Sequence, residues 1–259
     1  PDRATLIVVG DFESEDMVKR VQSLFGGWKP SGQPAAPVTI PPAPARSRTQ
    51  IFLVDRPDAS QSLITASYPA PEKSMEREPS LVAMNLAFGG SFNSRVNMNL
   101  REDKHWSYGA RSGFSDTKGA RQFTISTSVQ TDQTAPAMGE IRKEIQRATK
   151  IKPFTQEELD RSIVAQTVGF GSSWETNSAV LGYVTGLVAL GLPDTYYAEY
   201  PKLAKRLALQ EIRSAAPVVM NPDAMLWLIV GDLKKIAPSI RDLRWADVTV
   251  LDTDGKVVP

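Results

Sequence analysis

Apolar residues at the beginning of the chain first follow the pattern of a strand and then that of a helix. Residues 4–9 form a short, apolar, β-rich run, which predicts a strand. Residues 13–25 carry apolar positions at helical spacing, and Gly26-Gly27 then ends the predicted helix. We therefore predict a strand–helix unit, and we expect its unpaired strand to dock on a sheet or helix of this domain or of a neighbouring copy.

A proline-rich segment follows this unit. Prolines recur every few residues among Ala, Ser and Gly, and they favour extended polyproline structure because they cannot donate hydrogen bonds into a ladder. We predict a linker here, which divides the chain into three parts. These are a strand–helix tail at 1–28, the linker at 29–46 and a C-terminal domain at 47–259.

The C-terminal domain alternates between strand and helix patterns. It opens with two strands, continues with two helices around a Gly-Gly pair, and then forms a Ser/Thr-rich hairpin. Mostly helical segments follow until the chain returns to a strand. The predicted strands are 49–54, 61–68, 106–114, 121–129 and 225–230, and the predicted helices are about 76–88, 93–103, 134–149, 175–190 and 194–216, with one more opened by a capping box at Thr155 to Glu158.

A segment near the end of the chain repeats its beginning. Residues 222–232 match residues 1–11 from a shared Pro-Asp, through an apolar strand, to a shared Gly-Asp, at a constant offset of 221 residues. An amphipathic helix follows each copy. Since apolar strands often match by chance, coincidence remains the alternative to duplication. Under duplication, residues 1–27 are the tail of an earlier homologous domain, as expected of a piece of a longer protein that begins without Met.

Composition excludes several classes of function. The chain has 259 residues, of which 41% are hydrophobic, so it can bury a sizeable core. A net charge of +1 gives no electrostatic reason to expect a nucleic-acid partner. No apolar run approaches the ~18 residues that a membrane span needs. The chain has no cysteine, which removes thiolate ligands, cysteine nucleophiles and disulfides.

The chain also lacks the residues of a complete catalytic site. His105 is its only histidine, whereas H-x-x-E-H and H-E-x-x-H each need two. No orienting carboxylate is evident for His105 in a Ser-His-Asp arrangement, and no phosphate-binding glycine loop occurs. We therefore predict no metal site and no catalytic centre in this chain, and His105 is most simply an exposed loop residue.

The most specific signal lies between residues 85 and 110. A helix ends in a Gly-Gly turn, a Phe-x-Ser-Arg motif opens the next helix, and a Leu-Arg-Glu motif leads through a short loop into a strand that begins with Tyr-Gly. These motifs are Gly89-Gly90, Phe92 to Arg95, Leu100 to Glu102, and Tyr108-Gly109. The segment resembles the second domain of one half of a pitrilysin/insulinase-family zinc peptidase, a family that includes mitochondrial-processing-peptidase-like proteins.

The resemblance implies an α+β fold, with an antiparallel sheet of about five or six strands and helices packed mainly on one face. In this family two halves close around a peptide chamber, and the H-x-x-E-H zinc site lies in the first domain of the catalytic half. An Arg and a Tyr seven residues apart reach that site from the partner half, and they correspond here to Arg101 and Tyr108. Trp106 and His105 are weaker candidates for lining the chamber.

Arg101 and Tyr108 each also have a purely structural interpretation. An Arg near a helix C-terminus often interacts only with the last carbonyl groups, and a Tyr that opens a strand is often half-buried core. The sequence alone leaves these alternatives open for Arg101 and Tyr108.

The resemblance thus implies a non-catalytic, C-terminal part of a zinc-dependent endopeptidase that is inactive alone. It implies that zinc is held by the missing catalytic half, in the same chain or in a separate subunit, and that a peptide is the substrate. A bacterial periplasmic or cell-envelope location is also expected. The alternative function is a non-enzymatic binding or scaffold subunit of the same fold.

Overall fold

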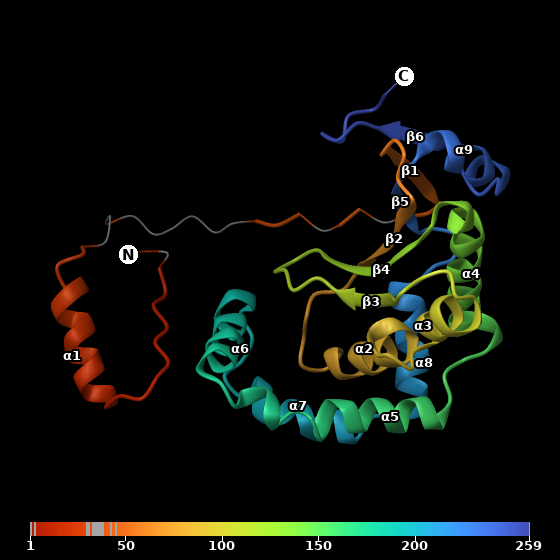
Figure 1. Ribbon diagram of the computed structural model, residues 1–259. Helices are drawn as coiled ribbons and strands as arrows, with labels where there is room; N and C mark the ends of the chain where they lie inside the picture. The colour runs from red at the N-terminus through yellow and green to blue at the C-terminus, as the bar shows by residue number, and fades with distance from the viewer. Residues whose placement is uncertain are drawn as a thin grey trace.

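A computed structural model describes residues 2, 4–29, 32, 39–41, 43–44 and 46–258 (Figure 1). Much of the predicted linker at 29–46 lies outside the described residues, as does the proline that begins the repeat at 1–11. No described helix is long and apolar enough to cross a membrane.

A six-stranded sheet forms the centre of the C-terminal domain, in the order β3-β4-β2-β5-β1-β6. The five strands that the sequence predicted are all present, and the sixth is a short strand at the C-terminal end. Their bounds are β1 Gln50–Asp55, β2 Gln61–Ala70, β3 Ala110–Phe114, β4 Arg121–Gln130, β5 Leu226–Gly231 and β6 Val248–Leu251. The α+β fold with about five or six strands is confirmed.

The sheet is mixed, so the expectation of an antiparallel sheet is right for only part of it. Strands β3, β4, β2 and β5 pair antiparallel, whereas β1 pairs parallel with both β5 and β6. Strands β5 and β6 run in the same direction because helix α9 (Leu233–Asp242) connects them. A helical crossover returns the chain in the same direction, and β1 lies between the two strands that α9 joins.

Helices cover one face of the sheet (Figure 1). Alternate residues of β4 and β5 are buried while those between them are partly or fully exposed, as expected when only one face is covered. The remaining α-helices are α1 Ser14–Phe25, α2 Glu78–Asn85, α3 Arg95–Asn97, α4 Thr134–Gln146, α5 Gln156–Thr167, α6 Asn177–Leu190, α7 Tyr196–Lys205 and α8 Leu209–Val219. The predicted helix at 194–216 is thus two helices, α7 and α8.

The strand predicted at residues 4–9 is absent from this structure. These residues are extended but pair with no strand, while α1 forms as predicted and has no buried residue. The unit is not packed on the C-terminal domain in this structure, and its docking on a neighbouring copy stays a prediction. Leu6 is 58% exposed and Val8 42% exposed, because these residues pack on no other segment of the described chain.

Candidate functional site

Arg101 lies in a wide helical turn that follows α3. Residues Met98–Asp103 form a π-helical turn, in which the amide of Lys104 donates to the carbonyl of Asn99 over 3.0 Å. Such turns are rare and frequently occur at functional sites. Here the turn ends the helix and places Arg101 on its surface, with a side chain that is 39% exposed.

The Arg101 guanidinium rests on an aromatic ring. It lies 4.5 Å from the centroid of Phe92, and its Nε is 3.3 Å from a carboxylate oxygen of Glu102. A guanidinium has five N–H donors, and this arrangement engages few of them. The stacking fixes the direction of the group, and its remaining donors have no partner among the described residues. In the described structure Arg101 does not donate to the last helical carbonyl groups, so that structural interpretation does not account for it.

Tyr108 projects into solvent just before β3. Its side chain is 91% exposed, so the alternative of a half-buried core residue is wrong. The backbone on either side is held in place, because Ser107 Oγ accepts from the amide of Gly109 over 3.0 Å and lies 2.7 Å from Thr127 Oγ1. An exposed phenol on a fixed backbone is available for a contact outside this chain.

The structure brings Arg101 and Tyr108 to the same cavity. The cavity has a volume of about 380 Å³, and its walls come from the Gly-Gly turn, the π-helical turn and the beginning of β3. Its lining residues are Gly89, Gly90, Ser91, Phe92, Asn97, Arg101, Tyr108, Gly109, Ala110, Arg111 and Ser112. Segments that the sequence marked as motifs therefore meet at one place.

Asn97 joins two walls of this cavity, and the sequence analysis did not single it out. Its Nδ2 donates to the carbonyl of Phe92 over 2.7 Å, and its Oδ1 accepts from the amide of Ala110 over 3.0 Å. Asn97 is 4% exposed, so its amide is held in a largely dry environment. It fixes the ring under Arg101 relative to the strand that follows Tyr108.

Gly89 explains why the first motif needs glycine. A Cβ at Gly89 would approach the backbone nitrogen of Ser112 to 2.9 Å, which is closer than a side chain can sit. The end of the helix therefore packs directly on β3 because Gly89 has no side chain. This close approach forms the inner wall of the cavity.

His105 and Trp106 do not line this cavity. His105 has a positive φ of 57°, is exposed, and places its Nδ1 3.1 Å from the carbonyl oxygen of Arg101. Trp106 is partly buried against the hydrophobic core, and Lys104 Nζ lies 5.7 Å from its ring centroid. Both residues shape the loop between Arg101 and Tyr108.

Arg95 of the Phe-x-Ser-Arg motif has a structural role. Its guanidinium forms two hydrogen bonds to the Glu158 carboxylate, of 2.6 and 2.7 Å, and a third to the carbonyl of Lys152. Glu158 also completes the predicted capping box with Thr155 at the beginning of α5. The motif therefore joins α3 to α5 and supports the turn that carries Arg101.

Glu158 makes stability depend on acid pH. Burial alone would raise the pKa of its carboxyl, but hydrogen bonds from Arg95 and Thr155 outweigh burial and hold that pKa below its ordinary value. The unfolded chain therefore binds the proton more readily. The resulting contribution to stability is present above the ordinary glutamate pKa and is lost as pH falls through the lower, folded value.

We expect Glu158→Gln to lower the free energy of unfolding by about 2 kcal/mol at pH 7, because charged hydrogen bonds are lost. The difference between variant and wild type should shrink as pH falls below about 4. Urea unfolding at pH 7 and pH 3.5 measures both values. Glu157→Gln is the matched control, since the neighbouring Glu157 side chain is 81% exposed. A difference that is the same at both pH values would contradict the expectation.

The described residues contain no group of three or more His, Asp or Glu side chains placed to hold a metal ion. What the site offers instead is a guanidinium and a phenol beside one cavity. These groups can hold or polarise a carbonyl group, but they supply neither a nucleophile nor a metal.

Comparison with known proteins gives a consistent result. The family model described as the peptidase M16 inactive domain matches residues 1–165. An uncharacterized zinc protease of Bacillus subtilis, YmxG, is 26% identical over 162 residues, which are 62% of this chain and 38% of that protein.

Solved structures of the same fold agree with this match. A peptidase M16 inactive domain from Pseudomonas fluorescens superposes with a TM-score of 0.73 at 18% identity, over 85% of this chain and 51% of that one. A protease from Helicobacter pylori gives a TM-score of 0.77 at 18% identity, over 86% of this chain and 53% of that one. The chain thus spans about half the length of these structures, and less of its Bacillus relative.

Proposed function

This chain belongs to the peptidase M16 family, and we propose that it is the non-catalytic part of a zinc-dependent endopeptidase that holds the substrate. The resemblance to pitrilysin/insulinase-type zinc peptidases is confirmed by the family match. The observation that carries the proposal is the position of Tyr108, which is 91% exposed and borders the same cavity as Arg101. An aromatic residue so exposed is well placed to contact something outside the chain.

The chemistry of the pair suits peptide hydrolysis. When a zinc-bound water attacks a peptide bond, negative charge builds on the carbonyl oxygen. The Arg101 guanidinium and the Tyr108 hydroxyl are donors that can hold that oxygen or a neighbouring backbone carbonyl. In this proposal zinc is bound by a separate catalytic half, and this chain closes the peptide chamber from the opposite side.

Reconstitution tests the proposal. We expect the chain alone to leave peptides intact, because its described residues hold no metal-binding cluster. Adding the H-x-x-E-H half of the same protein, in one chain or as a second subunit, should produce zinc-dependent cleavage of a quenched fluorescent peptide. Binding between the halves without cleavage would instead support a non-enzymatic binding or scaffold subunit. The expected periplasmic location stays a prediction, which cell fractionation tests.

We also propose that the strand–helix tail at 1–28 is the last part of a preceding homologous domain. At the offset of the repeat, Leu6 and Val8 correspond to Trp227 and Ile229 of β5. Both β5 residues are completely buried between the sheet and its helices, whereas Leu6 and Val8 are exposed. In this chain β5 pairs with β1 and β2. By analogy, residues 4–9 pair in the preceding domain with the two strands equivalent to β1 and β2.

Hydrogen exchange tests this assignment. We expect the amides of residues 5–9 to exchange rapidly in the chain as it stands, because they have no ladder partners. In a protein that contains an upstream homologous domain, the same amides should exchange as slowly as those of β5. Rapid exchange in both proteins would contradict the assignment, and the amides of β5 are the internal reference.

A further inference from the structure

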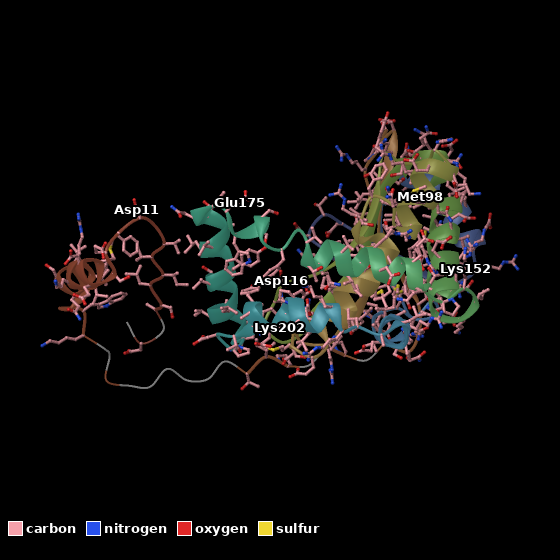
Figure 2. All side chains as sticks on the ribbon, turned by 90° about the horizontal axis from the view of Figure 1, so that it is seen from below. Asp11, Met98, Asp116, Lys152, Glu175 and Lys202 are labelled. Atoms are coloured by element: carbon pink, nitrogen blue, oxygen red, sulfur yellow. The ribbon has the colours of Figure 1, made fainter. Side chains whose placement is uncertain are left out.

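A second and larger cavity lies away from Arg101 and Tyr108. Its volume is about 600 Å³, within the range typical of small-ligand sites. Residues of α2, α6 and α7 line this cavity, together with Asp116 from the turn between β3 and β4. Figure 2 labels Asp116 beside these helices. There Asp116 forms a 3.0 Å ion pair with Lys73 from the segment after β2.

The walls of this cavity are aromatic. Tyr183, Tyr196, Tyr197 and Tyr200 all line it, and their rings continue into a cluster with Phe170. The centroids of Tyr183 and Tyr197 are 4.9 Å apart, and those of Tyr196 and Tyr197 are 5.1 Å apart in an edge-to-face arrangement. Packed rings of this kind form a rigid apolar surface that suits another ring.

Helix α6 is apolar but not buried, which indicates that this wall of the cavity contacts another molecule. Its sequence from Asn177 to Leu190 contains no charged residue, yet none of its residues is buried. A helix that is apolar on all sides normally lies in a core. In this chain one side of α6 lines the cavity through Gly182, Tyr183 and Gly186, and a Cβ at Gly182 would meet no atom within 4 Å, so open space lies beside Tyr183.

The cavity is also lined by polar groups. Tyr196 is 1% exposed, and its hydroxyl has no hydrogen-bond partner among the described residues. The neighbouring Tyr200 differs, since its hydroxyl donates to Gln166 over 2.6 Å. Burial raises the pKa of Tyr196, so its phenol keeps the proton and remains a donor. The Glu78 carboxylate lines the same cavity and raises that pKa further.

We propose that this cavity binds the side chain of a tyrosine in a polypeptide. A tyrosine ring matches the aromatic walls, and its phenol oxygen can accept from Tyr196. Its O–H can donate to the Glu78 carboxylate, whose oxygens each accept one hydrogen bond from Arg121 and have a second lone pair. Phenylalanine would leave the Tyr196 hydroxyl unpaired, and a charged side chain would lose its hydration. The site is separate from the Arg101 and Tyr108 cavity and needs no peptidase activity, so each proposal can fail alone.

Binding of two matched probes to the full chain tests this site. We expect N-acetyl-L-tyrosinamide to bind about tenfold more tightly than N-acetyl-L-phenylalaninamide, as measured by NMR titration. Tyr196→Phe should bring the two dissociation constants within about twofold of each other and leave the affinity for phenylalaninamide unchanged. Tyr200→Phe is the control, and it should keep the tenfold preference.

Filling the cavity gives the second test. A Cβ at Gly182 would meet no atom within 4 Å, and Gly182 lines the cavity, so we expect the leucine of Gly182→Leu to occupy part of the cavity and to favour the helix. This variant should bind neither probe. Equal affinity of wild type for the two probes would overturn the proposal, and so would binding that survives Gly182→Leu. Binding of p-cresol without binding of the tyrosinamide would also overturn it, since the cavity would then accept a free phenol and not a peptide.

Discussion

Replacing Arg101 by Ala is expected to lower kcat/KM of the reassembled peptidase by about 10²–10³-fold if the guanidinium acts on the developing oxyanion. The side chain is half-exposed and it contacts the Phe92 ring and Glu102, so folding should be little affected. The loss should therefore appear in kcat more than in the stability of the protein. Steady-state cleavage of a quenched fluorescent peptide, beside a urea unfolding curve, measures both quantities.

Three further variants separate charge, geometry and general surface effects. Arg101→Lys keeps the charge but loses the planar group that stacks on Phe92, so an intermediate loss is expected. Arg161→Ala removes an exposed arginine of α5 that pairs with Glu157, and it should cleave at the wild-type rate. Tyr108→Phe removes only the hydroxyl. If Arg101→Ala and Tyr108→Phe both cleave normally, the pair does not hold the substrate.

Local sequence signals predicted the helices, turns and strand that surround the candidate site. Gly89, the helix that follows it, the capping box at Thr155 and the strand after Tyr108 are all where the sequence placed them. Each depends on neighbours within a few residues or on one close backbone approach, which the residue type itself reveals. Exposure then contradicted the interpretation of Tyr108 as half-buried core, and no pattern in the sequence contains that information.

Long-range features were not predictable in the same way. The direction of β1 depends on strands more than 170 residues away in the chain, as the pairing of Gln50 with Leu226 shows. Asn97 looks like any polar helical residue until the fold brings Phe92 and Ala110 to its two ends. The aromatic cavity likewise appears only when α6, α7 and the turn after β3 meet.

Arg121 and Glu78 form the other long-range feature, a buried ion pair between β4 and the beginning of α2. Arg121 Nη1 donates to Glu78 Oε2 over 2.8 Å, and Nη2 donates to Oε1 over 3.1 Å. The two side chains are only 1% and 5% exposed. Arg121 Nε also donates to the carbonyl of Ser115, and the guanidinium lies 5.1 Å from the Phe114 ring. The pair therefore fixes the β3–β4 hairpin on α2.

Removing one member of this pair should produce the largest loss of stability in the domain. We expect Arg121→Ala to lower the free energy of unfolding by about 3–5 kcal/mol, because it leaves the Glu78 carboxylate buried and unpaired. Arg121→Met combined with Glu78→Gln should cost less than Arg121→Ala alone, since no uncompensated charge remains. Urea unfolding of the variants at pH 7 measures these differences, with Arg161→Ala as the exposed control. If the double variant is the least stable, direct attraction outweighs the burial of unpaired charge, and the pair contributes net stability to the fold.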